Sequence, residues 1–113
     1  MEQNKNKLIR LFVGNISTAI VHQLLEQAIA EDIHRKHYEK ECLHSFSLAK
    51  AYRGRIHPYQ SPLSEKDQAA VKRKIKRNVT KELQLRIAKG YKGLDLNSIE
   101  PAIEAALQKL RVK

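Results

Sequence analysis

The stretch Val71–Lys92 reads VKRKIKRNVTKELQLRIAKGYK and carries two patterns at once. Apolar residues recur at every fourth position, at Val71, Ile75, Val79, Leu83 and Ile87. Four-residue spacing aligns side chains along one ridge of an α-helix, so the stretch predicts an amphipathic helix whose ridge faces a core. It also holds nine lysines and arginines and one glutamate, so the other faces of this helix carry nearly unbalanced positive charge.

The composition of the whole chain favours one α-helical domain. The chain has 113 residues, which is near the commonest domain size, and 42% of them are hydrophobic, enough to fill one core. It contains four glycines, three prolines and no tryptophan, and residues that favour helices dominate. No run of residues has the two-residue period of a strand. We therefore expect a single all-α domain over residues 1–113.

Apolar spacing predicts four helices, over about residues 5–31, 32–53, 65–89 and 98–111. Gly14 weakens the first, which we expect either to bend there or to divide, with a second segment starting near Asn15 or Ser17. This first helix is apolar over more than one stripe, as a central helix or a dimer interface would be. The residues that lie off its main stripe are Leu8, Leu11, Val13, Val21, Leu25 and Ile29.

Capping residues mark where these helices begin and end. Gly54 fits the end of the second helix, and Ser64 followed by Asp67 resembles a capping box that opens the third. Either Gly90 or Gly93 can end the third helix in the left-handed conformation. Short connections between amphipathic helices predict a four-helix bundle or a compact helical array, with completion by dimerisation as a further option.

Positive charge is concentrated in one segment. The chain has 22 basic and 12 acidic residues, a net charge of +10, and residues 64–92 alone hold ten basic and three acidic residues, a net +7. Such a field suits a polyanion, and lysine and arginine bind nucleic-acid phosphates without reading sequence. We expect phosphate contacts first from the third helix and then from flanking loops, where a tyrosine could stack on a base. The helix candidates are Lys72, Arg73, Lys74, Lys76, Arg77 and Lys81, and the loop candidates are Arg53, Arg55 and Tyr91.

Other interpretations of the same pattern stay open. The basic face also fits a solvated surface that only aids solubility, and charge does not separate DNA from RNA. An alternative function is a homodimeric interaction module, in which the broad first helix pairs with a second copy and the basic helix docks on an acidic protein partner.

The histidines suggest a metal site as a weaker hypothesis. His37, Glu41 and His44 share one helical face, and Glu41 with His44 has the spacing at which helical bundles place a carboxylate and an imidazole. Catalytic motifs with a nucleophile, a phosphate-binding glycine loop or a dinucleotide fingerprint are missing from the sequence. The sequence therefore predicts no enzyme and no cofactor.

The single cysteine, Cys42, indicates a reducing compartment, because it has no partner in the chain for a disulfide. The N-terminal region imitates a secretory signal, with basic residues before an apolar run, but Asn15, Ser17 and Thr18 interrupt that run. Its longest uncharged stretch, residues 11–25, is shorter than the roughly 20 apolar residues that a bilayer needs. We expect a cytoplasmic protein without a membrane span.

Overall fold

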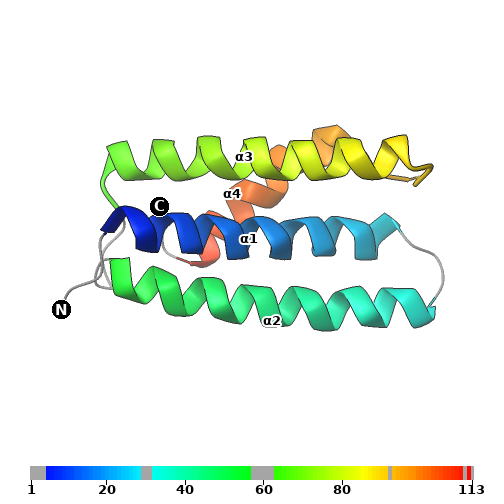
Figure 1. The fold of residues 1–113 in the computed structure, drawn as a ribbon, viewed down its shortest axis with the longest axis horizontal. Helices are drawn as coiled ribbons and strands as arrows, with labels where there is room; N and C mark the ends of the chain where they lie inside the picture. The colour runs from blue at the N-terminus through cyan, green and yellow to red at the C-terminus, as the bar shows by residue number, and fades with distance from the viewer. Residues whose placement is uncertain (1–4, 29–31, 57–62, 92, 111, 113) are drawn as a thin grey trace.

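The computed structural model describes residues 5–28, 32–56, 63–91, 93–110 and 112, without the side chains of residues 5, 32–35, 37 and 38. These residues form four α-helices and one 3-10 turn, and none of them lies in a strand (Figure 1). The prediction of an all-α fold is confirmed. The elements in chain order are α1 (Lys5–Ala28), α2 (Asp32–Ile56), α3 (Glu65–Ala88), η1 (Leu96–Ser98) and α4 (Ile99–Lys109).

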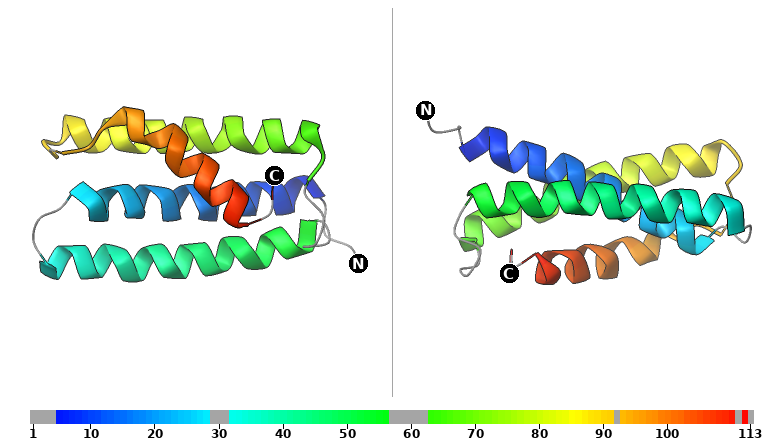
Figure 2. Two further views of the ribbon diagram at one scale, coloured as in Figure 1. Left: turned by 180° about the vertical axis from the view of Figure 1, so that it is seen from behind. Right: turned by 90° about the horizontal axis from the view of Figure 1, so that it is seen from below.

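Helix α1 is the central element. Helices α2 and α3 lie on either side of it, and α4 crosses one face of the layer that these three helices form (Figures 1 and 2). Helix α2 is antiparallel to α1, and α3 is antiparallel to α2 (Figure 1). Helices α1 and α3 therefore point in the same direction, with their N-terminal ends at the same end of the molecule. The fold is elongated, with extents of 44 × 23 × 22 Å.

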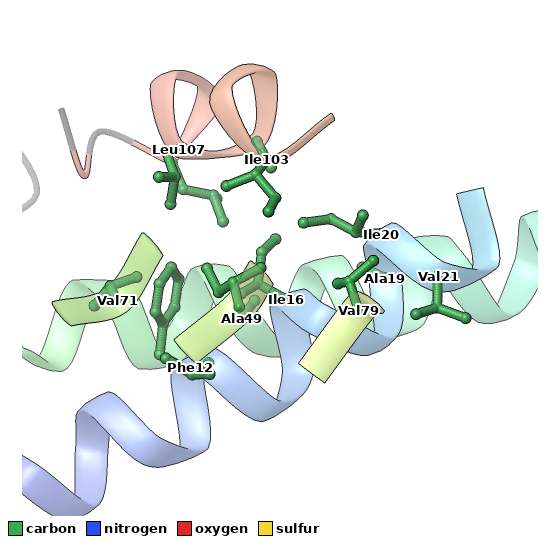
Figure 3. Close-up of a cluster of buried hydrophobic side chains, with 14 of the residues drawn as sticks. Phe12, Ile16, Ala19, Ile20, Val21, Ala49, Val71, Val79, Ile103 and Leu107 are labelled. Atoms are coloured by element: carbon green, nitrogen blue, oxygen red, sulfur yellow. The ribbon is translucent and has the colours of Figure 1, made fainter. Parts of the chain in front are cut away.

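The central position of α1 explains its broad apolar surface. Phe12, Ile16 and Leu25 are fully buried. Val13 and Val21, which lie off the main apolar stripe, are at most 5% exposed. These side chains meet residues from all three other helices in one core (Figure 3). Helix α1 is also continuous through Gly14, so the second segment expected near Asn15 or Ser17 does not occur. Much of this broad apolar surface is therefore used inside the chain.

The apolar ridge of α3 is shorter than its spacing suggests. Val71, Ile75, Val79 and Leu83 are completely buried, whereas Ile87 is 40% exposed. A four-residue step advances the side chain by about 40° around a helix of 3.6 residues per turn, so four steps carry it through about 160°. The ridge has turned out of the core when it reaches Ile87. The predicted five-residue ridge is wrong at its last position.

The predicted caps are mostly correct. The Asp67 N–H donates to Ser64 Oγ over 3.2 Å, which begins α3 at Glu65 as expected. Gly90 and Gly93 both take positive φ angles, of 99° and 82°, after α3 ends. Gly54 was the wrong terminator, because α2 continues to Ile56 and Gly54 keeps a negative φ. A glycine lowers helix propensity, but packing of the rest of the helix can outweigh that cost.

Candidate functional site

Two lysines of α3 face α4 and are neutralised there. Lys76 Nζ donates to Glu100 Oε1 over 2.7 Å. Lys72 Nζ lies 2.7 Å from Glu104 Oε1 and 3.7 Å from Glu100 Oε2. The acids that the sequence of α3 lacks are thus supplied by another helix. Lys72 and Lys76, both predicted phosphate contacts, link α3 to α4 through these surface ion pairs.

These ion pairs change the titration of their members. The hydrogen bond and positive charge of Lys76, with the charge of Lys72, lower the pKa of the Glu100 carboxyl. The hydrogen bond and negative charge of Glu104 raise the pKa of the Lys72 ammonium. A lowered carboxyl pKa stabilises the fold above the ordinary value for glutamate, and this stabilisation is lost as pH falls through the folded-state pKa.

The acid dependence of stability tests the link between α3 and α4. We expect the free energy of unfolding to fall as pH drops below 4.5, the ordinary pKa of glutamate, and Glu100→Gln to make that fall less steep. Urea denaturation between about pH 3 and about pH 7, a range that spans the ordinary pKa of glutamate, measures both slopes. Because the pairs are at the surface, added salt should shrink the difference. An unchanged acid slope in Glu100→Gln would show that the pairs do not form in solution.

Lys74 and Arg77 occupy another face of α3 and line a groove together with two cations of α1. A groove of about 770 Å³ runs between α1 and α3, and Lys7 and Arg10 line its opposite wall. We call it the basic groove, and its lining residues are Asn6, Lys7, Arg10, Val13, Gly14, Lys74, Arg77 and Asn78.

The basic groove holds uncompensated charge. Four cations and no carboxylate line it. Within the described part of the chain, no ion pair joins Lys7, Arg10, Lys74 or Arg77 to an acid. Like charges in one groove repel, so an anion that enters it gains favourable interactions from both walls. The arrangement is therefore suited to phosphate.

Sequence reasoning missed the α1 wall of this groove. Lys7 and Arg10 stand three residues apart, and Gly14 follows four residues later, so all three share one helical face. That spacing was visible in the sequence. What was not visible is that α1 lies beside α3 and parallel to it, which decides that this face meets Lys74 and Arg77.

A smaller pocket continues the basic groove toward the C-terminal end of α3. Its volume is about 360 Å³, and it shares Gly14 and Asn78 with the basic groove. We call it the polar pocket; its other lining residues are Ser17, Thr18, Val21, His22, Glu82 and Arg86. Ser17 is only 5% exposed, and its Oγ makes no hydrogen bond with any residue that the structure describes.

The structure separates the remaining nucleic-acid candidates. Arg53 is completely buried, so this predicted contact is not on the surface. Arg55 is exposed, with its guanidinium 5.8 Å from the centre of the Tyr52 ring. Tyr91 is 37% exposed, and the Arg86 guanidinium stands 5.6 Å from its ring centre. The C-terminal ends of α2 and α3 lie at opposite ends of the molecule, so Arg55 and Tyr91 do not meet (Figure 1).

Arg73 and Lys81 complete the predicted set. Both side chains are exposed on α3, and neither lines the basic groove or pairs with α4. Arg73 and Lys81 thus provide a comparison with the groove residues, because they carry the same charge on the same helix in a different setting.

The described residues contain no cluster of the kind that the metal-site hypothesis requires. No group of three or more histidine, cysteine, aspartate or glutamate side chains is close enough to hold an ion among them. His44 is exposed and Glu41 is partly exposed, while the side chain of His37 lies outside the described residues. Cys42 is half-buried, and its thiol donates to the Ala19 carbonyl over 3.3 Å. Burial, with the charge of Glu26, raises the pKa of this thiol, which disfavours the nucleophilic thiolate.

Comparisons with known proteins identify no relative: no protein-family model, curated protein or solved structure matches the chain. One helix, Asn6–Ala28, is long and apolar enough to cross a membrane by length and composition, and 61% of its most apolar window is buried in the fold. The core helix of a soluble protein and a signal sequence both meet that criterion. The absence of a membrane span and the cytoplasmic location stay predictions.

Proposed function

We propose that this protein binds nucleic acid, with Lys7, Arg10, Lys74 and Arg77 holding consecutive phosphates in the basic groove. The observation that carries the proposal is the convergence of four cations from two helices on one groove lined by no carboxylate. Each cation that meets a phosphate releases condensed counterions, which favours binding of any sequence.

The basic groove is built on a rigid support. On α3, the buried residues Ile75 and Val79 anchor the helix that presents Lys74 and Arg77. On α1, the buried residues Leu8 and Ile9 do the same for its first turns. Within each pair the cations stand three residues apart, or about 4.5 Å along the helix axis. Little backbone ordering is needed on binding, so more of the interaction energy contributes to affinity.

The proposed interface lies between α1 and α3 rather than on α3 and its flanking loops alone. Lys72 and Lys76 are removed from the set because α4 neutralises them, and Arg53 because it is buried. Arg73 and Lys81 lie outside the groove and add to the long-range field. Lys7 and Arg10 enter the set in their place.

Salt dependence tests the proposal. Fluorescence anisotropy of a labelled 12-nucleotide strand, titrated at salt concentrations from about 25 to 200 mM, should give a linear plot of log affinity against log salt. Four phosphate contacts predict a slope of about −3 with a single strand and about −3.6 with duplex DNA. Absence of binding at the lowest salt would overturn the proposal.

A polyglutamate chain of equal charge distinguishes the alternative, an acidic protein partner. Its carboxylates lack the geometry and the charge density of a phosphate backbone, so nucleic acid should bind more tightly at every salt concentration. If polyglutamate binds at least as tightly, the groove serves an acidic protein surface rather than nucleic acid.

A further inference from the structure

We infer that the groove between α1 and α3 takes single-stranded nucleic acid, with phosphates in the basic groove and one unpaired base in the polar pocket. This inference rests on the proposed function, because the phosphates position the base. It adds the form of the ligand and a second subsite, neither of which follows from charge.

The basic groove and the polar pocket form one path. Gly14 of α1 and Asn78 of α3 line both, so the junction between the two compartments lies at these residues. The polar pocket, at about 360 Å³, falls within the range of sites that hold small molecules. Its lining carries hydroxyl, carboxamide, imidazole, carboxylate and guanidinium groups, which can match the donors and acceptors on the edge of a base.

Ser17 provides an independent sign of a ligand. Its side chain is 95% buried on the wall of the polar pocket, and its Oγ has no hydrogen-bond partner among the described residues. Buried hydroxyls nearly always have a partner, because losing water without replacing it is unfavourable. The Asn78 carboxamide, which also lines the pocket, makes no side-chain hydrogen bond with the described residues either. A base in the polar pocket would lie beside both residues.

Gly14 keeps the junction open. It lies in the interior of α1 with a negative φ, and a Cβ added there would meet no atom within 4 Å. Neither close packing nor backbone conformation therefore requires glycine at this position. Glycine is also less favourable than other residues in a helix interior. Its effect in this fold is to leave exposed backbone and free space where the phosphate and base compartments join.

The residues at the far end of the polar pocket favour an unpaired base over a duplex. Arg86 lines the polar pocket and stands 5.6 Å from the ring centre of Tyr91, which is 37% exposed. Guanidinium and aromatic faces are the surfaces on which proteins stack unpaired bases. In a duplex, each base is stacked and paired, so it cannot enter a pocket beside the phosphates.

Matched ligands separate the base from the phosphates. The probes are a 12-nucleotide oligothymidylate, an oligomer of equal length and charge made of abasic tetrahydrofuran units, and a 12-base-pair duplex. We expect the full-length protein to bind oligothymidylate about tenfold more tightly than the abasic strand, since base contacts each contribute roughly that much. We also expect it to bind oligothymidylate more tightly than the duplex at equal phosphate concentration.

Gly14→Gln tests the junction, with Gly54→Gln as its matched control. Both glycines are helical, and a Cβ at either would meet no atom within 4 Å. Both variants should melt at or above the wild-type temperature, because glutamine is the better helix former. Only Gly14→Gln should lose the preference for oligothymidylate over the abasic strand. Ser17→Ala should lose that preference as well and remain as stable as wild type, since it removes a hydroxyl that has no partner.

The outcomes distinguish the two proposals. Equal binding of oligothymidylate and the abasic strand, with the salt slope retained, would overturn the base pocket and leave phosphate binding in place. A full preference in Gly14→Gln or in Ser17→Ala would also overturn the pocket assigned here. Failure of every strand to bind at low salt would overturn the proposed function itself.

Discussion

Replacing Lys74 and Arg77 together with glutamate is expected to weaken binding of a single strand by at least about 100-fold at low salt. Both residues line the basic groove, so the double variant places two acids opposite Lys7 and Arg10. The loss of two phosphate contacts should also reduce the magnitude of the salt slope by about 1.4. Fluorescence anisotropy over a range of salt concentrations measures both quantities.

The matched control is the double variant Arg73→Glu with Lys81→Glu. It makes the same change in net charge on the same helix, but at exposed positions outside the groove. We expect less than about a tenfold loss, through the weaker long-range field, and a nearly unchanged slope. Equal losses in the two double variants would show that net charge, rather than the basic groove, holds the ligand. Circular dichroism should show that both remain helical.

The second large effect concerns stability. Ile75→Ala should lower the free energy of unfolding by about 2–5 kcal/mol, because it removes a fully buried side chain and leaves a cavity. Ile87→Ala, the same chemical change on the same apolar spacing, should cost no more than about 0.5 kcal/mol since Ile87 is 40% exposed. Urea denaturation of the two variants and the wild type measures the difference.

The contrast between these two isoleucines also reports on assembly. A loss at Ile87 as large as that at Ile75 would mean that Ile87 is covered in solution. If that loss depended on protein concentration, a second copy of the chain would be the cover. A small loss at Ile75 would contradict the core described here.

The helices could be predicted from the sequence because apolar spacing and capping residues are local signals within each helix. The spacing from Val71 to Leu83 marks the buried face of α3, and Ser64 with Asp67 marks its start. Gly54 failed as a stop signal because it reflects local propensity alone, and α2 runs past it to Ile56. Local signals identify elements well and place their ends less reliably.

Only part of the candidate site could be predicted from such local signals. The helical wheel of α3 contains Lys74 and Arg77, but it cannot show which of the basic residues face an acid and which face another cation. The partners of Lys72 and Lys76 lie on α4, about 24 to 32 residues away in sequence. Lys7 and Arg10, the cations across the basic groove from Lys74 and Arg77, lie on α1, more than 60 residues away in sequence. Both sets depend on how helices pack, which no single period encodes.

The central position of α1 has a consequence for how the protein is made. Helix α2, which packs most extensively against α1, follows it directly, whereas α3 and α4, which complete its cover, come later along the chain. About 80 residues separate the end of α1 from the end of α4, and at 5–20 residues per second their synthesis takes about 4–16 seconds. During that interval the broad apolar surface of α1 lacks its final cover and is open to chaperones and aggregation. The central helix of the finished fold is thus incompletely covered while the later helices are being made.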